Sequence, residues 1–234
     1  MKRVGLIGGM SWESSAHYYA AINRGVRDAL GAPHSADCVM LSLDFQPIAA
    51  MQAAGEWDGL GDAMAGAALT LEKAGADFIL VCTNTMHCLA HRITAATDVP
   101  LLHIAEPLGQ AIRAAGMKRV GLLGTRFTME QPFYRDYLNA HFGLEVVIPG
   151  DDDRTTVHNV IYDELVAGIV RDESRAAYRA VIERLVEQGA EGVVLGCTEI
   201  MMLVGESDSP VPLFDTTILH AEAAVERALE RVAL

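Results

Sequence analysis

The sequence predicts an α/β protein made of two pseudo-symmetric lobes, each a mostly parallel sheet flanked by helices. Short apolar runs alternate with longer segments of helical apolar spacing, which is typical of parallel sheets. One segment also occurs twice, at 71–87 (LEKAGADFILVCTNTMH) and at 185–204 (LVEQGAEGVVLGCTEIMMLV), because Leu71, Gly75 and Ala76 reappear 114 positions later as Leu185, Gly189 and Ala190. Two copies of one plan predict two similar lobes that face each other across a cleft.

The first lobe is expected to contain four strands in the first 104 residues. The run from Arg3 to Gly8 predicts a buried strand, and a glycine turn then leads into a helix that Ser11 or Ser14 can cap. The remaining elements expected here are a strand in 37–44, a helix through about Ala53, a break at 55–58, a helix over 60–74, a strand over 78–81, a helix over 84–96 and a short strand over 100–104.

The second lobe repeats the plan after a junction near residue 105. A strand and glycine turn at 120–125 restate the first strand, and a helix is expected to end near Phe142 and Gly143. The following elements are a strand over 145–149, a solvated acidic turn at 151–153, helices over 155–170 and 173–188, the strand before Cys197, a strand over 210–215 and a closing helix from Thr216 to Val232. We expect the last piece to return to the first lobe, which gives lobes of 1–104 plus 211–234 and of 105–210.

Composition excludes several classes of partner. The chain has 234 residues, 51% of them apolar, and a formal net charge of −13, so nucleic acid and anionic membranes are poor partners. No signal-peptide pattern follows Met1, and no apolar run reaches the roughly 18 residues of a membrane span. We therefore expect a cytoplasmic location, where the four cysteines remain free thiols.

Cys197 is the main candidate for chemistry. It follows a buried strand, in a Gly-Cys-Thr-Glu turn that is expected to open a helix. Ligands of open α/β sheets bind at the carboxyl ends of strands, and a helix amino terminus there lowers a thiol pKa. Cys197 is thus a candidate thiolate, with an activity that would rise through a pKa below about 8.5; the alternative is a small packing residue.

The repeat places Thr83, not a cysteine, opposite Cys197, since 83 plus 114 is 197. Thr83 is either a proton donor or a helix cap, because both use the same hydroxyl. Cys82 is a rival, but strand alternation turns it away from the side chain of residue 83. Cys38 and Cys88 are interpreted as packing residues.

Other polar residues at the same strand ends are candidates for substrate binding. Asn84, Thr85, Thr125 and Thr198 could hold a carboxylate or could serve only local turns and caps. Glu199 could accept from an ammonium group or complement a helix end. Met10 and Gln52 are candidates for the pocket wall. His87 and His91 lie one turn apart, but without a third ligand they are interpreted as a polar helix face.

The motifs GLIGGMSWES, CTNTMH, LLGT and GCTEI together resemble the aspartate/glutamate racemase family over nearly the whole chain. The resemblance implies a cofactor-free active site between two lobes, often in a homodimer, with two cysteines that act on opposite faces of the substrate α-carbon. Here Thr83 replaces the first cysteine, and a hydroxyl is a far poorer base than a thiolate. The resemblance therefore implies that Cys197 takes the α-proton of the L-enantiomer, that Thr83 returns one from the other face, and that the enzyme favours L-substrates.

Common cofactors are disfavoured by the sequence itself. Pyridoxal phosphate needs a lysine at its site, but Lys2, Lys73 and Lys118 each precede a strand and so lie at the wrong end of a sheet. The first glycine turn also lacks the G-x-G-x-x-G spacing of a dinucleotide site. We expect a cofactor-independent racemase acting on aspartate, glutamate or a similar small polar amino acid. The alternatives are a related cysteine-dependent isomerase or decarboxylase, and a non-catalytic amino-acid-binding protein.

Overall fold

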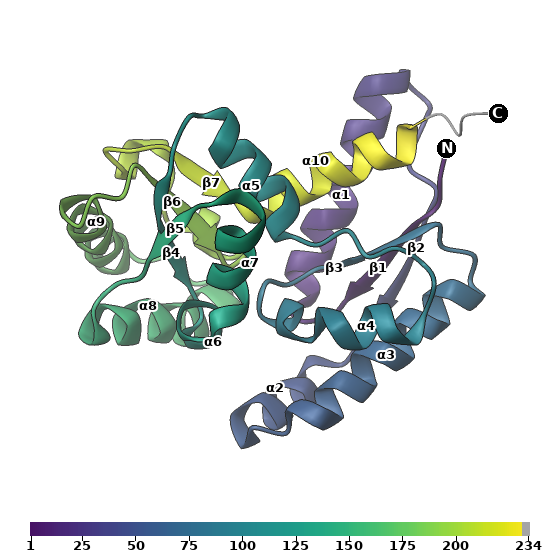
Figure 1. Ribbon diagram of the computed structural model, residues 1–234, viewed down its shortest axis with the longest axis horizontal. Helices are drawn as coiled ribbons and strands as arrows, with labels where there is room; N and C mark the ends of the chain where they lie inside the picture. Colours follow the sequence, from purple (N-terminus) through teal and green to yellow (C-terminus); the bar gives the residue numbers. More distant parts are fainter. Residues whose placement is uncertain (231–234) are drawn as a thin grey trace. The chain divides into compact units, whose positions relative to one another are not determined.

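A computed structural model describes residues 1–230 as alternating strands and helices (Figure 1). The chain divides into two compact units, one formed by residues 1–104 with the chain from His220 onward, the other by Ala105–Leu219. The expected end of the closing helix at Val232 lies outside the described residues. Within residues 1–230, no helix is long and apolar enough to cross a membrane.

The first unit is built on a parallel sheet with the strand order β2-β1-β3. A single parallel bridge between Ile79 and Leu101 adds the short fourth strand that was expected over 100–104. The strands are β1 (Val4–Gly8), β2 (Cys38–Ser42) and β3 (Phe78–Val81); the helices are α1 (Trp12–Leu30), α2 (Phe45–Ala54), α3 (Trp57–Lys73), the 3-10 helix η1 (Thr85–Leu89), α4 (Ala90–Ala96) and most of α10 (Thr216–Leu229).

Helices cover both faces of this sheet because its strands are apolar on both sides. Val4 and Leu6 of β1 pack with Tyr18 of α1 and with alanines of α10. Ile7 points to the opposite face, where it packs with Leu60 and other residues of α3. Alternate strand residues point to opposite faces, so a continuous apolar strand needs a cover on each.

The second unit has the parallel strand order β5-β4-β6-β7. Residues of α8 and α9 pack against Leu123, Val193 and Leu195 on one face of this sheet. The strands are β4 (Arg119–Gly124), β5 (Glu145–Val147), β6 (Gly192–Gly196) and β7 (Leu213–Asp215); the helices are α5 (Ala105–Ala114), α6 (Arg126–Glu130), α7 (Pro132–Phe142), α8 (Asp151–Asp163), η2 (Leu165–Ala167), α9 (Asp172–Glu187), η3 (Ile200–Met202) and η4 (Glu206–Asp208).

The two sheets have the same strand register, which confirms the repeat. In the first sheet Ile7 of β1 lies opposite Val81 of β3, and in the second Leu123 of β4 lies opposite Leu195 of β6. Thr83 is two residues beyond Val81, and Cys197 is two residues beyond Leu195. The two side chains therefore occupy equivalent positions at the carboxyl ends of equivalent strands.

The structure differs from the sequence-based elements at several places. The helix expected over 155–170 ends at Asp163 as α8 and is followed by the short helix η2. The acidic residues 151–153 form the first turn of α8 instead of a loop, because carboxylates suit a helix amino terminus. Residues 105–107, which the sequence suggested as a crossing between the lobes, form the start of α5. Residues 211–219 fall in the second unit, since β7 pairs with β6, and the return to the first unit starts only at His220. The turn at Cys197 leads into the short 3-10 helix η3 instead of the expected longer helix.

Candidate functional site

Close packing of two strands fixes the backbone before Cys197. At Gly196 an added Cβ would lie 2.8 Å from the Leu123 carbonyl oxygen and 2.9 Å from Leu122 Cδ1. Gly196 also pairs with Gly124 across the sheet. Only glycine fits so close an approach, and the chain leaves the strand immediately afterwards. The position of the Cys197 backbone is therefore set by the sheet.

The Cys197 thiol donates a hydrogen bond to a carboxylate two residues further along. Its Sγ lies 2.9 Å from Glu199 Oε2, and the Thr198 hydroxyl donates to the same oxygen at 2.7 Å. Cys197 is half-buried, while Thr198 and Glu199 are buried. Three of the predicted site residues thus form one hydrogen-bonded group, in which Glu199 can accept the thiol proton.

This environment raises the pKa of Cys197 well above its ordinary value, first through burial and then through the Glu199 carboxylate. The sequence-based expectation of a lowered pKa is therefore wrong. It assumed an α-helix amino terminus after the cysteine, whereas η3 has three residues and Glu199 places a negative charge beside the sulfur. Cys197 is therefore a thiol near neutral pH, and a thiolate forms only when another group accepts its proton.

Tyr162 is a neighbour of this group that sequence reasoning missed. Burial raises the pKa of its phenol, and the charges of Cys197 and Glu199 raise it further. Tyr162 lies near the end of α8, which is more than thirty residues before Cys197 in the chain. Its electrostatic interaction with Cys197 and Glu199 is one that no local sequence pattern marks.

In the first unit, Thr83 leads a short polar segment at the end of β3. Thr83 is half-buried, and Asn84 and Thr85 are buried. The carbonyl oxygen of Thr83 lies 2.8 Å from Nδ1 of His87. The helix η1 has Asn84 as its N-cap, with no side-chain cap bond, so the structure gives no support to a capping role for Thr83.

Cys82 lies in the core instead of at the strand tip. It is fully buried in the cluster with Leu6, Tyr18 and Leu80, and burial raises its pKa strongly. The expected alternation between residues 82 and 83 explains this orientation. Cys38 and Cys88 are half-buried and pack against the two core clusters, as expected; burial raises the pKa of Cys88 to about 11.

Three predicted binding residues have partners within their own units. The Gln52 amide donates to Met86 Sδ at 3.2 Å and is buried, and Met10 is buried in the same apolar cluster as Met86. Thr125 is the N-cap of α6, where it accepts from the Thr128 backbone at 3.3 Å. Gln52 and Thr125 therefore have hydrogen-bond partners in their own units, and Met10 is a packing residue of the core.

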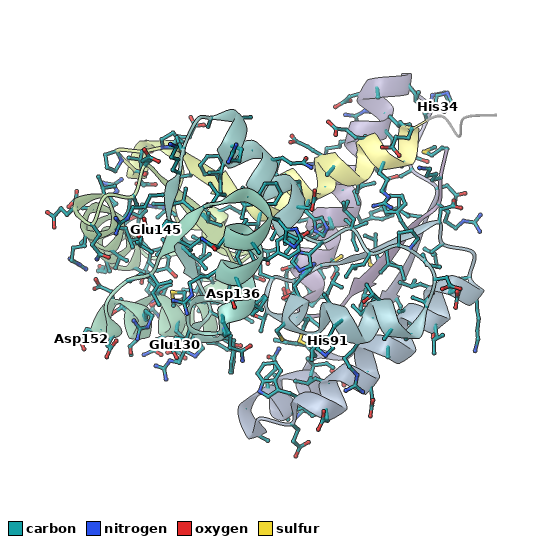
Figure 2. All side chains as sticks on the ribbon, viewed as in Figure 1. His34, His91, Glu130, Asp136, Glu145 and Asp152 are labelled. Carbon is teal, nitrogen blue, oxygen red and sulfur yellow. The ribbon has the colours of Figure 1, made fainter. Side chains whose placement is uncertain are left out.

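The histidine pair does not form the polar helix face that the sequence indicated. His91 is exposed on α4 (Figure 2), whereas His87 is buried. His87 accepts a hydrogen bond on Nε2 from the Ile104 backbone at 3.2 Å. Among residues 1–230, no group of three or more histidine, cysteine or acidic side chains is arranged to hold a metal ion.

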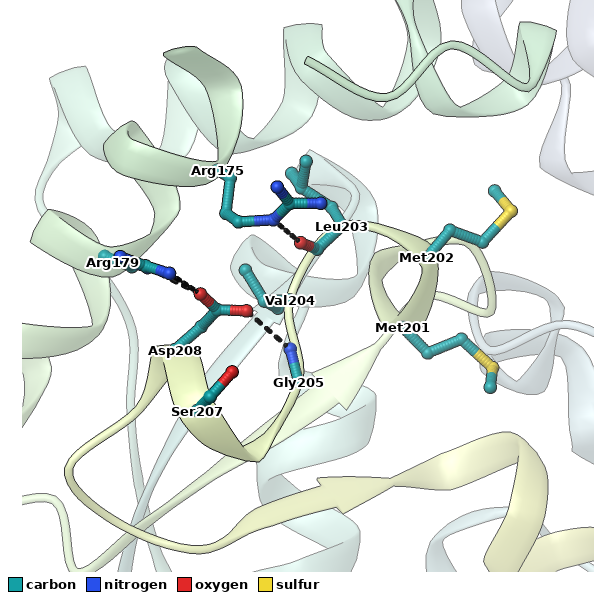
Figure 3. A pocket seen from close by; sticks show the side chains of 9 residues that line it. All are labelled: Arg175, Arg179, Met201, Met202, Leu203, Val204, Gly205, Ser207 and Asp208. Atoms are coloured by element: carbon teal, nitrogen blue, oxygen red, sulfur yellow. Dashed lines mark hydrogen bonds and ion pairs between the residues drawn. The ribbon is translucent and has the colours of Figure 1, made fainter. Parts of the chain in front are cut away.

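A separate pocket of about 340 Å³ lies in the second unit, beside the segment that follows Glu199 (Figure 3). Its two guanidinium groups already have partners: Arg175 binds the Leu203 carbonyl oxygen and Asp172, and Arg179 binds Asp208. The pocket is lined by Arg175, Arg179, Met201, Met202, Leu203, Val204, Gly205, Ser207 and Asp208.

Two parallel sheets share one register, with a thiol just beyond a strand end in one and a hydroxyl just beyond the equivalent strand end in the other, which defines a two-unit α/β protein with matching strand ends. The model of the Asp/Glu/hydantoin racemase family matches residues 7–224. The chain belongs to this family, and it is accordingly an isomerase that acts on amino acids.

Similar proteins support this assignment. A candidate Asp/Glu racemase from Yersinia pestis is 50% identical, with a TM-score of 0.93 over 98% of this chain and 100% of that one. An aspartate racemase homologue from Pyrococcus horikoshii OT3 is 31% identical, with a TM-score of 0.85 and the same coverage. The broad specificity amino-acid racemase RacX from Bacillus subtilis (strain 168) is 30% identical over 175 residues, which are 74% of each protein.

Proposed function

We propose that this protein racemises aspartate, glutamate or a similar small polar amino acid without a cofactor, with Cys197 as base and Thr83 as proton donor. The observation that carries the proposal is the hydrogen bond from Cys197 Sγ to Glu199 Oε2, 2.9 Å long, at the strand end equivalent to that of Thr83. A base needs an outlet for its own proton, and the carboxylate supplies one.

The proposed reaction begins with the L-enantiomer. The thiol proton moves to Glu199, breaking S–H and forming O–H, and the resulting thiolate takes the substrate α-proton. The electron pair of the broken C–H bond is delocalised into the substrate carboxylate. The Thr83 hydroxyl then protonates the carbanion from the opposite face and takes a replacement proton from solvent, while Glu199 releases to solvent the proton that it took from the thiol. The D-enantiomer forms, and both residues return to their starting protonation states.

The remaining polar residues at the strand ends are proposed to bind the substrate. Backbone and side-chain donors there can steady the negative charge that develops on the carboxylate. Gln52 carries no charge, so it cannot form an ion pair with a carboxylate on the substrate side chain. This favours substrates with small polar side chains and does not require a second carboxylate. The binding residues proposed are Met10, Gln52, Asn84, Thr85, Thr125, Thr198 and Glu199.

The proposal implies a handed enzyme. The Thr83 hydroxyl can give a proton, but its alkoxide is too scarce near neutral pH to remove the α-proton of a D-substrate. L-substrates should exchange their α-proton quickly and invert slowly, whereas D-substrates should be nearly inert to exchange. The homodimer and the cytoplasmic location that the sequence and the resemblance predict remain predictions, and sedimentation and cell fractionation test them.

The test is a panel of both enantiomers of the common amino acids in deuterated water. Proton resonance follows loss of the α-proton, and chiral chromatography follows inversion. Exchange and inversion of L-aspartate or L-glutamate support the proposal. A pure binding protein would exchange nothing, and a decarboxylase would release carbon dioxide; either result contradicts it.

A further inference from the structure

A buried histidine holds the backbone of the proposed proton donor. His87 follows Thr83 by four residues and lies on η1, directly after β3. Its ring Nδ1 is 2.8 Å from the Thr83 carbonyl oxygen. Its other nitrogen, Nε2, is 3.2 Å from the backbone nitrogen of Ile104. One side chain therefore joins the end of β3 to the end of the segment that pairs beside it.

The partners of His87 determine where its proton lies. The Ile104 N–H can only donate, so Nε2 must be the accepting, unprotonated nitrogen. Nδ1 then carries the proton and donates it to the Thr83 carbonyl. Both ring nitrogens are satisfied in the neutral form, and a second proton on Nε2 would break the bond to Ile104. The burial of the ring and its neighbours His103 and His220 also hold its pKa well below the usual range.

The surroundings make this arrangement stiff. The centroid of the His87 ring lies 4.7 Å from that of the His103 ring and 5.9 Å from that of the His220 ring. Both pairs are arranged edge to face. His220 accepts from the Tyr18 hydroxyl at 2.9 Å and donates to the Leu102 carbonyl at 2.9 Å. The segment that holds His87 is thus itself held by a second buried histidine. A side chain fixed in this way can fix its own hydrogen-bond partner.

We infer that His87 is a positioning residue for Thr83: its bond to the Thr83 carbonyl sets the turn that aims the hydroxyl. The inference rests on the proposed function. Without this bond the backbone at Thr83 can shift, which moves its Cα and the attached hydroxyl while leaving Cys197 unaffected. A proton donor misplaced by about 1 Å transfers its proton much more slowly. His87 should therefore matter for proton return and not for proton removal.

Two substitutions separate the two bonds of His87. In His87→Asn the amide nitrogen can take the place of Nδ1 and keep the donation to Thr83. In His87→Gln the longer side chain brings its amide oxygen to the place of Nε2 and keeps only the bond from Ile104. Both variants bury a neutral amide, so they carry similar costs of a lost ring. The exposed His91→Gln serves as the surface control.

The measurement is the ratio of inversion to α-proton exchange for an L-substrate in deuterated water. We expect His87→Gln to lower this ratio about tenfold, while His87→Asn stays within about threefold of wild type and His91→Gln is unchanged. A structural role alone would lower inversion and exchange together, so an unchanged ratio in His87→Gln overturns the inference, as does an equal fall in the Asn variant.

Nitrogen resonance of the wild type gives a second readout that needs no variant to fold. It should show His87 neutral, with its proton on Nδ1, from pH 6 to 8; a proton on Nε2 at pH 7 contradicts the inference. If wild type exchanges no α-proton of any amino acid, the proposed function fails, and the inference with it. If wild type exchanges and only the ratio is insensitive, the inference alone fails.

Discussion

The ends of β3 and β6 occupy the same place in their sheets but hold their key residues by different means. At the end of β3 a neutral histidine binds the backbone of Thr83 and leaves its hydroxyl to act on another group. At the end of β6 a carboxylate binds the side chain of Cys197 itself. The comparison teaches that the two units share a backbone plan while the side-chain surroundings of their strand ends differ. In the proposed function, one end positions a proton donor and the other removes a proton.

The strongest test of this difference is removal of the thiol. Cys197→Ala should lower α-proton exchange of L-substrates by about 1,000-fold or more, since the neighbouring Glu199 carboxylate is a far weaker base than a thiolate. Exchange in deuterated water measures the loss, and circular dichroism checks folding. Cys88→Ala is the matched control and should keep its activity. Wild-type exchange in Cys197→Ala would show that the two ends have been assigned the wrong roles.

Making the two ends chemically alike should remove the handedness. Thr83→Cys places a second thiol at the equivalent strand end and should raise exchange of D-substrates by about 100-fold. Thr83→Ala should instead lose inversion while L-substrates still exchange. If the cysteine variant folds and gains nothing with D-substrates, the equivalence of Thr83 and Cys197 does not extend to their chemistry.

Glu199 should have opposite effects on reactivity and turnover. Glu199→Gln removes the charge that helps to raise the pKa of Cys197, so alkylation by iodoacetamide at pH 8 should become about tenfold faster. Racemisation should fall by about tenfold or more because the amide accepts no proton. In wild type, alkylation should still be rising with pH at about pH 9, the ordinary value of the thiol pKa, instead of levelling off there. Parallel changes in both rates would contradict a proton-accepting role.

Acid should distinguish the units by stability. Burial lowers the pKa of His220 in the first unit from 6.5 to about 3. Between these values the unfolded chain binds a proton that the folded chain excludes, so the free energy of unfolding rises with pH and this contribution is complete above pH 6.5. The contribution of His220 to the free energy of unfolding should be lower at pH 5 than at pH 7 by about 2 kcal/mol. This figure follows from about 1.4 kcal/mol per pH unit.

Urea unfolding at the two pH values measures this term. The ring of His220 faces Tyr18, His87 and the backbone of Leu102, so these groups define its folded environment. His220→Gln should reduce the difference between pH 5 and pH 7, and the part that remains is attributed to His87, whose pKa burial also lowers. An equal slope in wild type and variant would show that His220 does not control the acid sensitivity of the first unit.

The sequence was sufficient for the strands and for the register that pairs Thr83 with Cys197. Buried parallel strands appear in the sequence as short apolar runs bounded by glycines, so the two copies of the repeat can be aligned. The register of the two sheets confirms that alignment. It was not sufficient for the state of the thiol. A Gly-Cys-Thr-Glu turn is compatible with a helix or with a single 3-10 turn, and only the latter brings the Glu199 carboxylate onto the sulfur.

Contacts between distant segments were the other part that could not be predicted. His87 and His91 have helical spacing, but the helix covers a core, so one is buried and the other exposed. The partner of His87 at Ile104 comes from a segment that joins the sheet through one bridge. Such contacts depend on the packed fold, and no local pattern contains them.

The path of the chain also determines the order in which the protein can be completed during synthesis. The second unit is continuous from Ala105 to Leu219, whereas the first needs α10, which is synthesised after nearly all of the second unit. Until then Val4, Leu6 and Phe78 lack the alanines of α10 that cover them, and the Lys2 N–H lacks the Ala228 carbonyl. During synthesis, residues 1–104 therefore keep an exposed apolar face until α10 has been made. We expect this region to be the part of the nascent chain that binds chaperones.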